Sequence, residues 1–134
     1  MASVVEIEGV GATHASSLSA AGVPTVEALL SEGATPAGRK ALADRTGISE
    51  TLILTWVNHG DLARINGIAG QYAELLEAAG VDTVPELAQR NAVNLTAKMS
   101  EINAARNLVN RVPGESEVTR WIAEAATLPR HISY

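Results

Sequence analysis

Side chains of the types that catalyse reactions or bind metals are present, but their spacing supports neither chemistry. The histidines have no spacing that would place two ligands on one helical face, and cysteine is absent, so the sequence predicts no metal site and no cofactor. The serines lack a nucleophile-elbow motif, and several carboxylates fall near predicted helix ends, where they favour N-terminal turns. We therefore expect a protein that is not an enzyme. The residues considered are His14, His59, His131, Ser16, Ser17, Ser19, Ser31, Asp44, Asp61, Glu115 and Glu117.

Basic side chains are the other group that could do chemistry, by binding an anion, and they concentrate toward the C-terminal end. Residues 1–87 contain four basic and eleven acidic side chains, whereas residues 88–134 contain six and four. The candidate basic patch consists of Arg90, Lys98, Arg106 and Arg111. At about 100° per residue, Lys98 and Arg106 lie roughly 80° apart on a helix, and Arg111 falls about 140° farther round. This spacing favours a solvated surface over a single basic stripe.

The composition is typical of a folded helical domain. The chain has 134 residues, of which 46% are apolar and 19% charged, and its net charge is −5. This length suits a single domain with a substantial core. Phenylalanine is absent and aromatic residues make up only 3%, which favours closely packed helices over a β-sandwich. We therefore expect an all-α protein. No apolar run approaches membrane-spanning length and no cysteine is present, so we also expect a cytoplasmic location.

An internal repeat indicates how the helices are organised. Residues 7–30 recur without a gap as residues 65–88, with 11 of 24 positions identical at an offset of 58. Trp56 and Trp121 correspond at an offset of 65, so the second copy has about seven additional residues before its tryptophan. Each tryptophan has apolar neighbours at helical spacing and is predicted to anchor the core of its own repeat. The expected halves are residues 1–64 and 65–134.

Capping residues predict where short helices begin and end. Gly22 and Gly80 are expected to end helices, and Thr25 and Thr83 to cap the helices that follow. The tail after Pro129 is expected to be extended. The other predicted helices run from Thr35-Pro36 to near Gly47, from Ser49 through Trp56, from Leu95 to Arg111, and from Ser116 to about Thr127.

A glycine-containing turn precedes the first predicted helix of each repeat and resembles the helix-hairpin-helix motif. In that family the glycines allow a tight turn, and backbone amides at the turn and at the helix N-terminus hold a phosphate. The candidate phosphate-binding residues are Gly9, Val10, Gly11, Thr13 and His14 in the first copy and Gly67, Ile68, Ala69 and Gly70 in the second. Alanine at position 69 predicts a less open second turn. Two alternatives remain: the glycines only permit a tight turn between helices, or the turn contacts a protein.

Nearly the whole chain also resembles a bacterial family of tandem helix-hairpin-helix repeats of unknown function, DUF4332. The phrases that carry this resemblance are GATPAGRKALADRTGI, WVNHGDLARI, AGVDTVPELAQRN and the late LPR. The resemblance implies two tandem helix-hairpin-helix (SAM-like) repeats of about five short helices each, packed into one compact unit.

Two better-known modules are similar to the phrase LLEAAGVDTVPELAQRN: the C-terminal domain of the RNA polymerase α subunit and the acidic repeats of a bacterial transcription elongation factor. The first resemblance implies DNA binding, and the second implies protein binding. No lysine or arginine follows either glycine turn, and Glu6, Glu8, Glu74 and Glu77 place negative charge nearby, which disfavours phosphate. We therefore expect a non-catalytic binding or scaffolding module with a protein partner and no membrane contact. The alternative is weak, sequence-independent binding of DNA or RNA through the hairpin amides.

Overall fold

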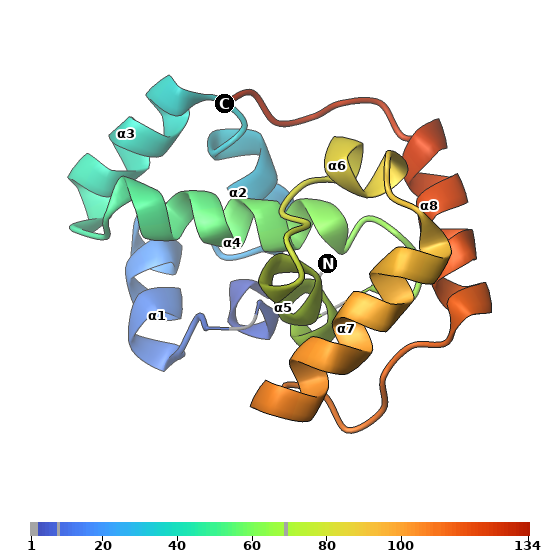
Figure 1. Ribbon diagram of the computed structural model, residues 1–134. Coiled ribbons are helices and arrows are strands. Elements are labelled where there is room, and N and C mark those ends of the chain that lie inside the picture. Colours follow the sequence, from blue (N-terminus) through green and yellow to red (C-terminus); the bar gives the residue numbers. More distant parts are fainter. Residues whose placement is uncertain (1–2, 8, 69) are drawn as a thin grey trace. The chain divides into compact units, whose positions relative to one another are not determined.

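The computed structural model describes residues 3–7, 9–68 and 70–134, and in these ranges it contains one 3-10 turn, eight α-helices and no strand (Figure 1). The all-α prediction is therefore confirmed. None of the described helices combines the length and the apolar character needed to cross a bilayer. The elements are η1 (Val4–Glu6), α1 (Ala12–Ala20), α2 (Val26–Glu32), α3 (Pro36–Thr46), α4 (Glu50–Leu62), α5 (Gly70–Ala78), α6 (Val84–Ala88), α7 (Ala92–Arg106) and α8 (Glu115–Thr127).

The chain divides into two compact units. Unit 1 comprises Met1–Asp61 together with His131–Tyr134, and unit 2 comprises Leu62–Arg130. Unit 1 contains η1, the helices α1 to α3 and nearly all of α4, whereas unit 2 contains α5 to α8. The sequence predicts about five short helices in each repeat, but unit 2 has four among its described residues. Residues 62–64, which match η1 at the offset of 58, run instead from the end of α4 into a turn.

Equivalent main-chain hydrogen bonds recur at the offset of 58. After α1, the amide of Val23 donates to the carbonyl of Leu18 at 2.8 Å. After α5, the amide of Val81 donates to the carbonyl of Leu76, also at 2.8 Å. The glycine before each donor has a positive φ, 87° at Gly22 and 94° at Gly80. The predicted helix ends at these glycines are therefore confirmed.

Threonine caps begin the second helix of each unit, as the sequence predicts. Thr25 Oγ1 accepts a hydrogen bond from the Ala28 amide at 3.1 Å, and Thr83 Oγ1 accepts one from the Glu86 amide at 3.2 Å. In unit 2 the Thr83 hydroxyl also donates to Glu86 Oε1 at 3.0 Å. These caps bond amides that have no partner within their helix. Each threonine is therefore explained by the helix that directly follows it.

Each unit has its own hydrophobic core with one tryptophan inside it. Trp56 and Trp121 are both fully buried, which confirms that each is a core residue. In unit 2, α8 packs against α6 and α7, and α5 packs against α7. The buried core of unit 1 consists of Val4, Ile7, Val10, Leu18, Val23, Leu29, Leu30, Leu42, Ile48, Ile53, Trp56, Val57 and Ile132. That of unit 2 consists of Leu62, Ile65, Ile68, Ala73, Leu75, Leu76, Ala79, Val81, Val84, Leu87, Leu95, Met99, Val109, Val118, Trp121 and Ala125.

The longest helix begins and ends earlier than its apolar spacing predicts. The prediction of Leu95 to Arg111 is wrong, because α7 ends at Arg106 and Asn107 adopts a left-handed conformation with φ 50°. The Asn103 side chain holds the chain beyond this point, since it accepts from the Val109 amide at 2.9 Å and donates to the Val109 carbonyl at 3.0 Å. Val109 is therefore a buried residue of the loop after α7, although its spacing from the apolar residues of the helix suggested a helical position.

The last residues of the chain belong to the core of unit 1. Ile132 is only 1% exposed, and the Ser133 amide donates to the Ala34 carbonyl at 2.7 Å. The buried guanidinium of Arg39 donates to two carbonyls, that of Gly33 at 2.8 Å and that of Ser133 at 2.9 Å. Figure 1 shows this end of the chain beside the turn between α2 and α3. The tail therefore completes a packed unit.

Candidate functional site

Gly9 forms the first candidate turn between two buried side chains. Ile7 and Val10 lie in the core of unit 1, and the Val10 amide donates to the Ile7 carbonyl at 3.0 Å. Gly9 has φ 90°, a conformation that residues with a Cβ rarely adopt. Gly11 is the N-cap of α1, and no side chain caps the first amides of this helix. The turn is therefore fixed by its apolar flanks, while the start of α1 has no side-chain cap.

The second candidate turn repeats this arrangement in unit 2. The Ile68 amide donates to the Ile65 carbonyl at 3.1 Å, and both side chains are buried. Gly67 has φ 95°, and Gly70, the first residue of α5, has φ 40°. Ala69 lies outside the described residues, so the less open turn predicted for it stays a prediction.

Each glycine turn lies against the tryptophan of its own unit. A Cβ built on Gly9 would lie 3.6 Å from Trp56 Nε1, and one built on Gly67 would lie 3.0 Å from Trp121 Nε1. The sequence aligns the two glycines at an offset of 58 and the two tryptophans at an offset of 65. Neither offset indicates that the turn and the indole touch, so this contact could not be predicted from the sequence.

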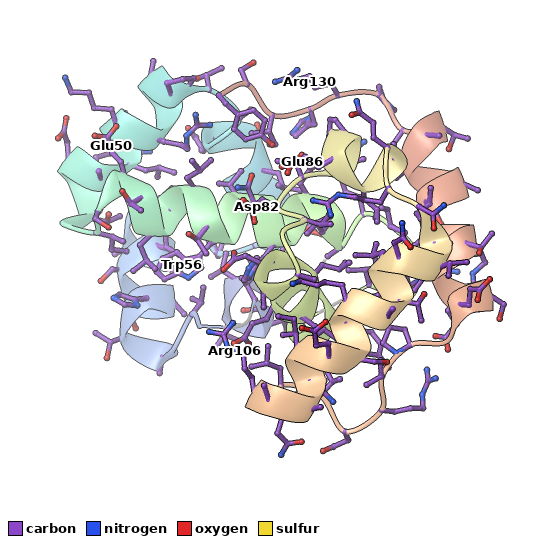
Figure 2. The ribbon with its side chains drawn as sticks, in the orientation of Figure 1. Glu50, Trp56, Asp82, Glu86, Arg106 and Arg130 are labelled. Atoms are coloured by element: carbon purple, nitrogen blue, oxygen red, sulfur yellow. The ribbon has the colours of Figure 1, made fainter. Side chains whose placement is uncertain are left out.

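A second aromatic ring packs on each indole, at matching positions of α1 and α5. The ring centroids of His14 and Trp56 are 5.0 Å apart with planes tilted by 54°, and those of Tyr72 and Trp121 are 5.6 Å apart with planes tilted by 52°. Figure 2 places Trp56 between α4 and α1, which carries His14. Of the predicted phosphate ligands, His14 therefore packs on the indole, whereas Thr13 is exposed.

We expect both Gly67→Ala and Gly9→Ala to lower the free energy of unfolding. The loss for Gly67→Ala should exceed the loss for Gly9→Ala by about 1 kcal/mol. Both changes force a Cβ into a left-handed conformation, so they share that strain. Only the Cβ at Gly67 is also tight against the indole, at 3.0 Å compared with 3.6 Å at Gly9. Denaturant unfolding followed by the fluorescence of Trp121 and of Trp56 would measure the two losses. Equal losses would show that the indole contact at Gly67 has no effect.

The charges around the second turn are mixed. The Asn66 amide donates to the Glu124 carboxylate, with 3.3 Å to each oxygen. Arg120 Nη2 lies 3.8 Å from the position a Cβ would take on Gly67. Trp121 Nε1 is buried and has no hydrogen-bond partner among the described residues. The Asn66 amide is thus already bound by a carboxylate, while the Arg120 guanidinium and the Trp121 indole nitrogen lie close to the turn as further donors.

The predicted basic residues have different surroundings in unit 2. Arg90 and Lys98 line one pocket, whereas Arg106 lies in the last turn of α7 (Figure 2). Arg111 lies in the loop after α7, where its guanidinium makes two hydrogen bonds to the Glu117 carboxylate, at 2.8 and 3.1 Å. This pairing raises the pKa of Arg111, and the hydrogen bonds from Arg111 and from the Gly114 amide lower the pKa of Glu117.

In the part of the chain that the structure describes, no group of three or more histidine, aspartate or glutamate side chains could hold a metal ion. The candidate site consists of the two glycine turns with their indoles, together with Arg90 and Lys98, which line the same pocket.

A comparison with protein families identifies the relatives of this chain. The model described as a domain of unknown function (DUF4332) matches residues 8–128. The chain belongs to this family. The DUF4332 match spans both glycine turns and both tryptophans, so the features described above lie within the family's own region. Searches of curated proteins and of solved structures found no match.

Proposed function

We propose that this chain is a non-catalytic binding or scaffolding module, made of two tandem helix-hairpin-helix units, whose partner is a protein. Two observations support the repeated hairpins: the glycine turns have the same hydrogen bond and nearly the same φ, and each lies against an indole. In such turns a free backbone amide is what holds a phosphate.

The observation that carries the choice of partner is the hydrogen bond between the Asn66 amide and the Glu124 carboxylate. A carboxylate at this turn occupies a donor and repels phosphate, so the turn stabilises the fold and does not bind phosphate. The charge of the units supports the same choice. Unit 1 has three basic and seven acidic side chains, and unit 2 has seven and eight. An acidic unit 1 suits a protein partner with a basic surface.

The test is recovery of the partner from the lysate of the source cell with the tagged chain, before and after nuclease treatment. We expect one stoichiometric protein that survives the nuclease and is lost at high salt, because complementary charges contribute to the contact. Recovery that disappears after nuclease treatment would contradict a protein partner.

Weak binding of a DNA or RNA backbone is the second candidate function, and the first turn favours it. Gly11 caps α1 without a side chain, so the amides at the start of this helix have no side-chain partner, and an anion could bind there. Fluorescence anisotropy of a short labelled duplex, at about 50 mM and about 200 mM salt, tests this candidate. Binding that weakens steeply with salt and is reduced by Gly11→Val in a folded chain would support it. No binding at the lower salt concentration would exclude it.

A further inference from the structure

Unit 2 contains a pocket that neither glycine turn uses. It has a volume of about 350 Å³ and lies where the end of α5, the loop between α6 and α7, and the first turns of α7 meet. Ala79 and Leu95 provide apolar walls and are 5% and 2% exposed. A volume of this size falls within the range of pockets that hold small molecules.

The start of α7 places the polar lining of the pocket on one face. Asn91 caps the helix, since its Oδ1 accepts from the Asn94 amide at 3.0 Å. Positions 91, 94, 95 and 98 are spaced as one face of a helix, so these four residues all border the same space. Gln89 adds a third carboxamide from the loop.

Two cations border this pocket, and none of its lining residues is acidic. Arg90 Nη2 donates to the Gly80 carbonyl at 2.7 Å, which holds the guanidinium beside the end of α5. Neither Arg90 nor Lys98 has a carboxylate partner among the described residues. The matching region of unit 1 differs, because Arg45 donates to the Ala21 carbonyl at 3.2 Å and also lies 3.9 Å from Glu32. Two cations without carboxylate partners are thus a property of the unit 2 pocket.

We propose that this pocket binds a small phosphomonoester. A phosphomonoester carries a charge of about −1.5 to −2 at neutral pH, which matches the two cations. Arginine binds phosphate oxygens through its planar set of donors, and lysine binds them as a point charge. The carboxamides of Asn91, Asn94 and Gln89 can bond hydroxyl groups of the ester's body, and Leu95 packs against its carbon atoms. This site is independent of the macromolecular partner proposed above.

The experiment is an NMR titration of the ¹⁵N-labelled full chain with ribose 5-phosphate, with ribose and acetate as comparison ligands. We expect saturable shifts at the amides of residues 89–98, weaker or no response to ribose and acetate, and loss of affinity as the pH falls below the phosphate's second pKa of about 6. Lys98→Gln is expected to weaken binding by about tenfold or more, since a charge-assisted hydrogen bond is lost.

Arg106→Gln is the matched control, because it removes the same charge from the same helix but lies outside the pocket lining. We expect it to leave the affinity unchanged. Both side chains are exposed, so both variants should fold. Equal weakening by the two variants, equal affinity for acetate, or the absence of saturable shifts would each overturn the proposal. Shifts at residues 65–70 in place of residues 89–98 would also overturn it.

Discussion

Gly38→Ala is expected to lower the free energy of unfolding of unit 1 by about 3 kcal/mol, although alanine is the better helix former by about 1 kcal/mol. A Cβ on Gly38 would clash with the carbonyl oxygen of Glu32, at the end of the preceding helix. The Gly38 amide is also bonded to Thr35 Oγ1 at 3.1 Å, which holds this turn of α3 in place. Because the clash is with backbone, a side-chain rotation cannot relieve it.

The sign of this change separates the two effects. Helix propensity alone predicts that Gly38→Ala stabilises the chain, whereas the close approach of α2 and α3 predicts that it destabilises. Ala41→Gly, at an exposed position of the same helix, is the control and should cost about 1 kcal/mol. Denaturant unfolding followed by Trp56 fluorescence in a Trp121→Phe background reports on unit 1. An increase in stability for Gly38→Ala would contradict the packing of α2 against α3.

Ile132→Ala is expected to cost unit 1 about 3 kcal/mol, although position 132 is near the C-terminal end of the chain. Ile132 is 1% exposed in a core made otherwise of residues from Val4 to Val57. The shortened side chain leaves a cavity and weakens the docking of the tail. The hydrogen bonds from Ser133 to Ala34 and from Arg39 to Ser133 depend on that docking.

The readout for the tail is the same fluorescence transition, with hydrogen exchange of the Ser133 amide as a local measurement. Ile132→Ala should lower the unfolding midpoint and speed the exchange of this amide. Val93→Ala is the control, since Val93 is an apolar side chain that is 56% exposed, and its loss should change stability by less than about 0.5 kcal/mol. An Ile132→Ala chain as stable as the Val93→Ala chain would show that the tail is not part of the core.

The sequence predicts those parts of the fold that depend on neighbouring residues. Thr25, Thr83 and the pair Thr35-Pro36 each begin a helix where predicted, because a cap needs only the amides two or three positions ahead. Gly47 ends α3 in a left-handed conformation, as a glycine at this position commonly does. These local rules operate within one turn of a helix, so they can be read without a structure.

The sequence does not predict features that depend on distant contacts. The end of α7 is set by Asn107 and by the Asn103 side chain, which bonds the Val109 backbone and overrides an apolar spacing that suggests a longer helix. The burial of Ile132 depends on the turn between α2 and α3, where Ala34 lies 98 positions earlier in the sequence. Apolar periodicity contains no information on either contact.

For the candidate site, the sequence predicts several of the residues but not the contacts between them. The repeat identifies the glycine turns, and the tryptophans are predicted as core residues. Their mutual contact arises only when the last helix of each unit packs on its first turn. Glu124 reaches the Asn66 amide across 58 positions, and no motif marks the two as partners. The pocket at Arg90 and Lys98 also escapes prediction, because Arg90 lies in the loop before α7 and off the helical face that Lys98 shares.

The central claim is that the glycine turns serve the packing of each unit and do not capture the nucleic-acid backbone. The most direct test is to follow the amides of residues 9–14 and 65–70 by NMR while a short DNA duplex is added at about 50 mM salt. We predict that these amides do not shift. Saturable shifts at these positions, which diminish when the salt is raised to about 200 mM, would contradict the claim.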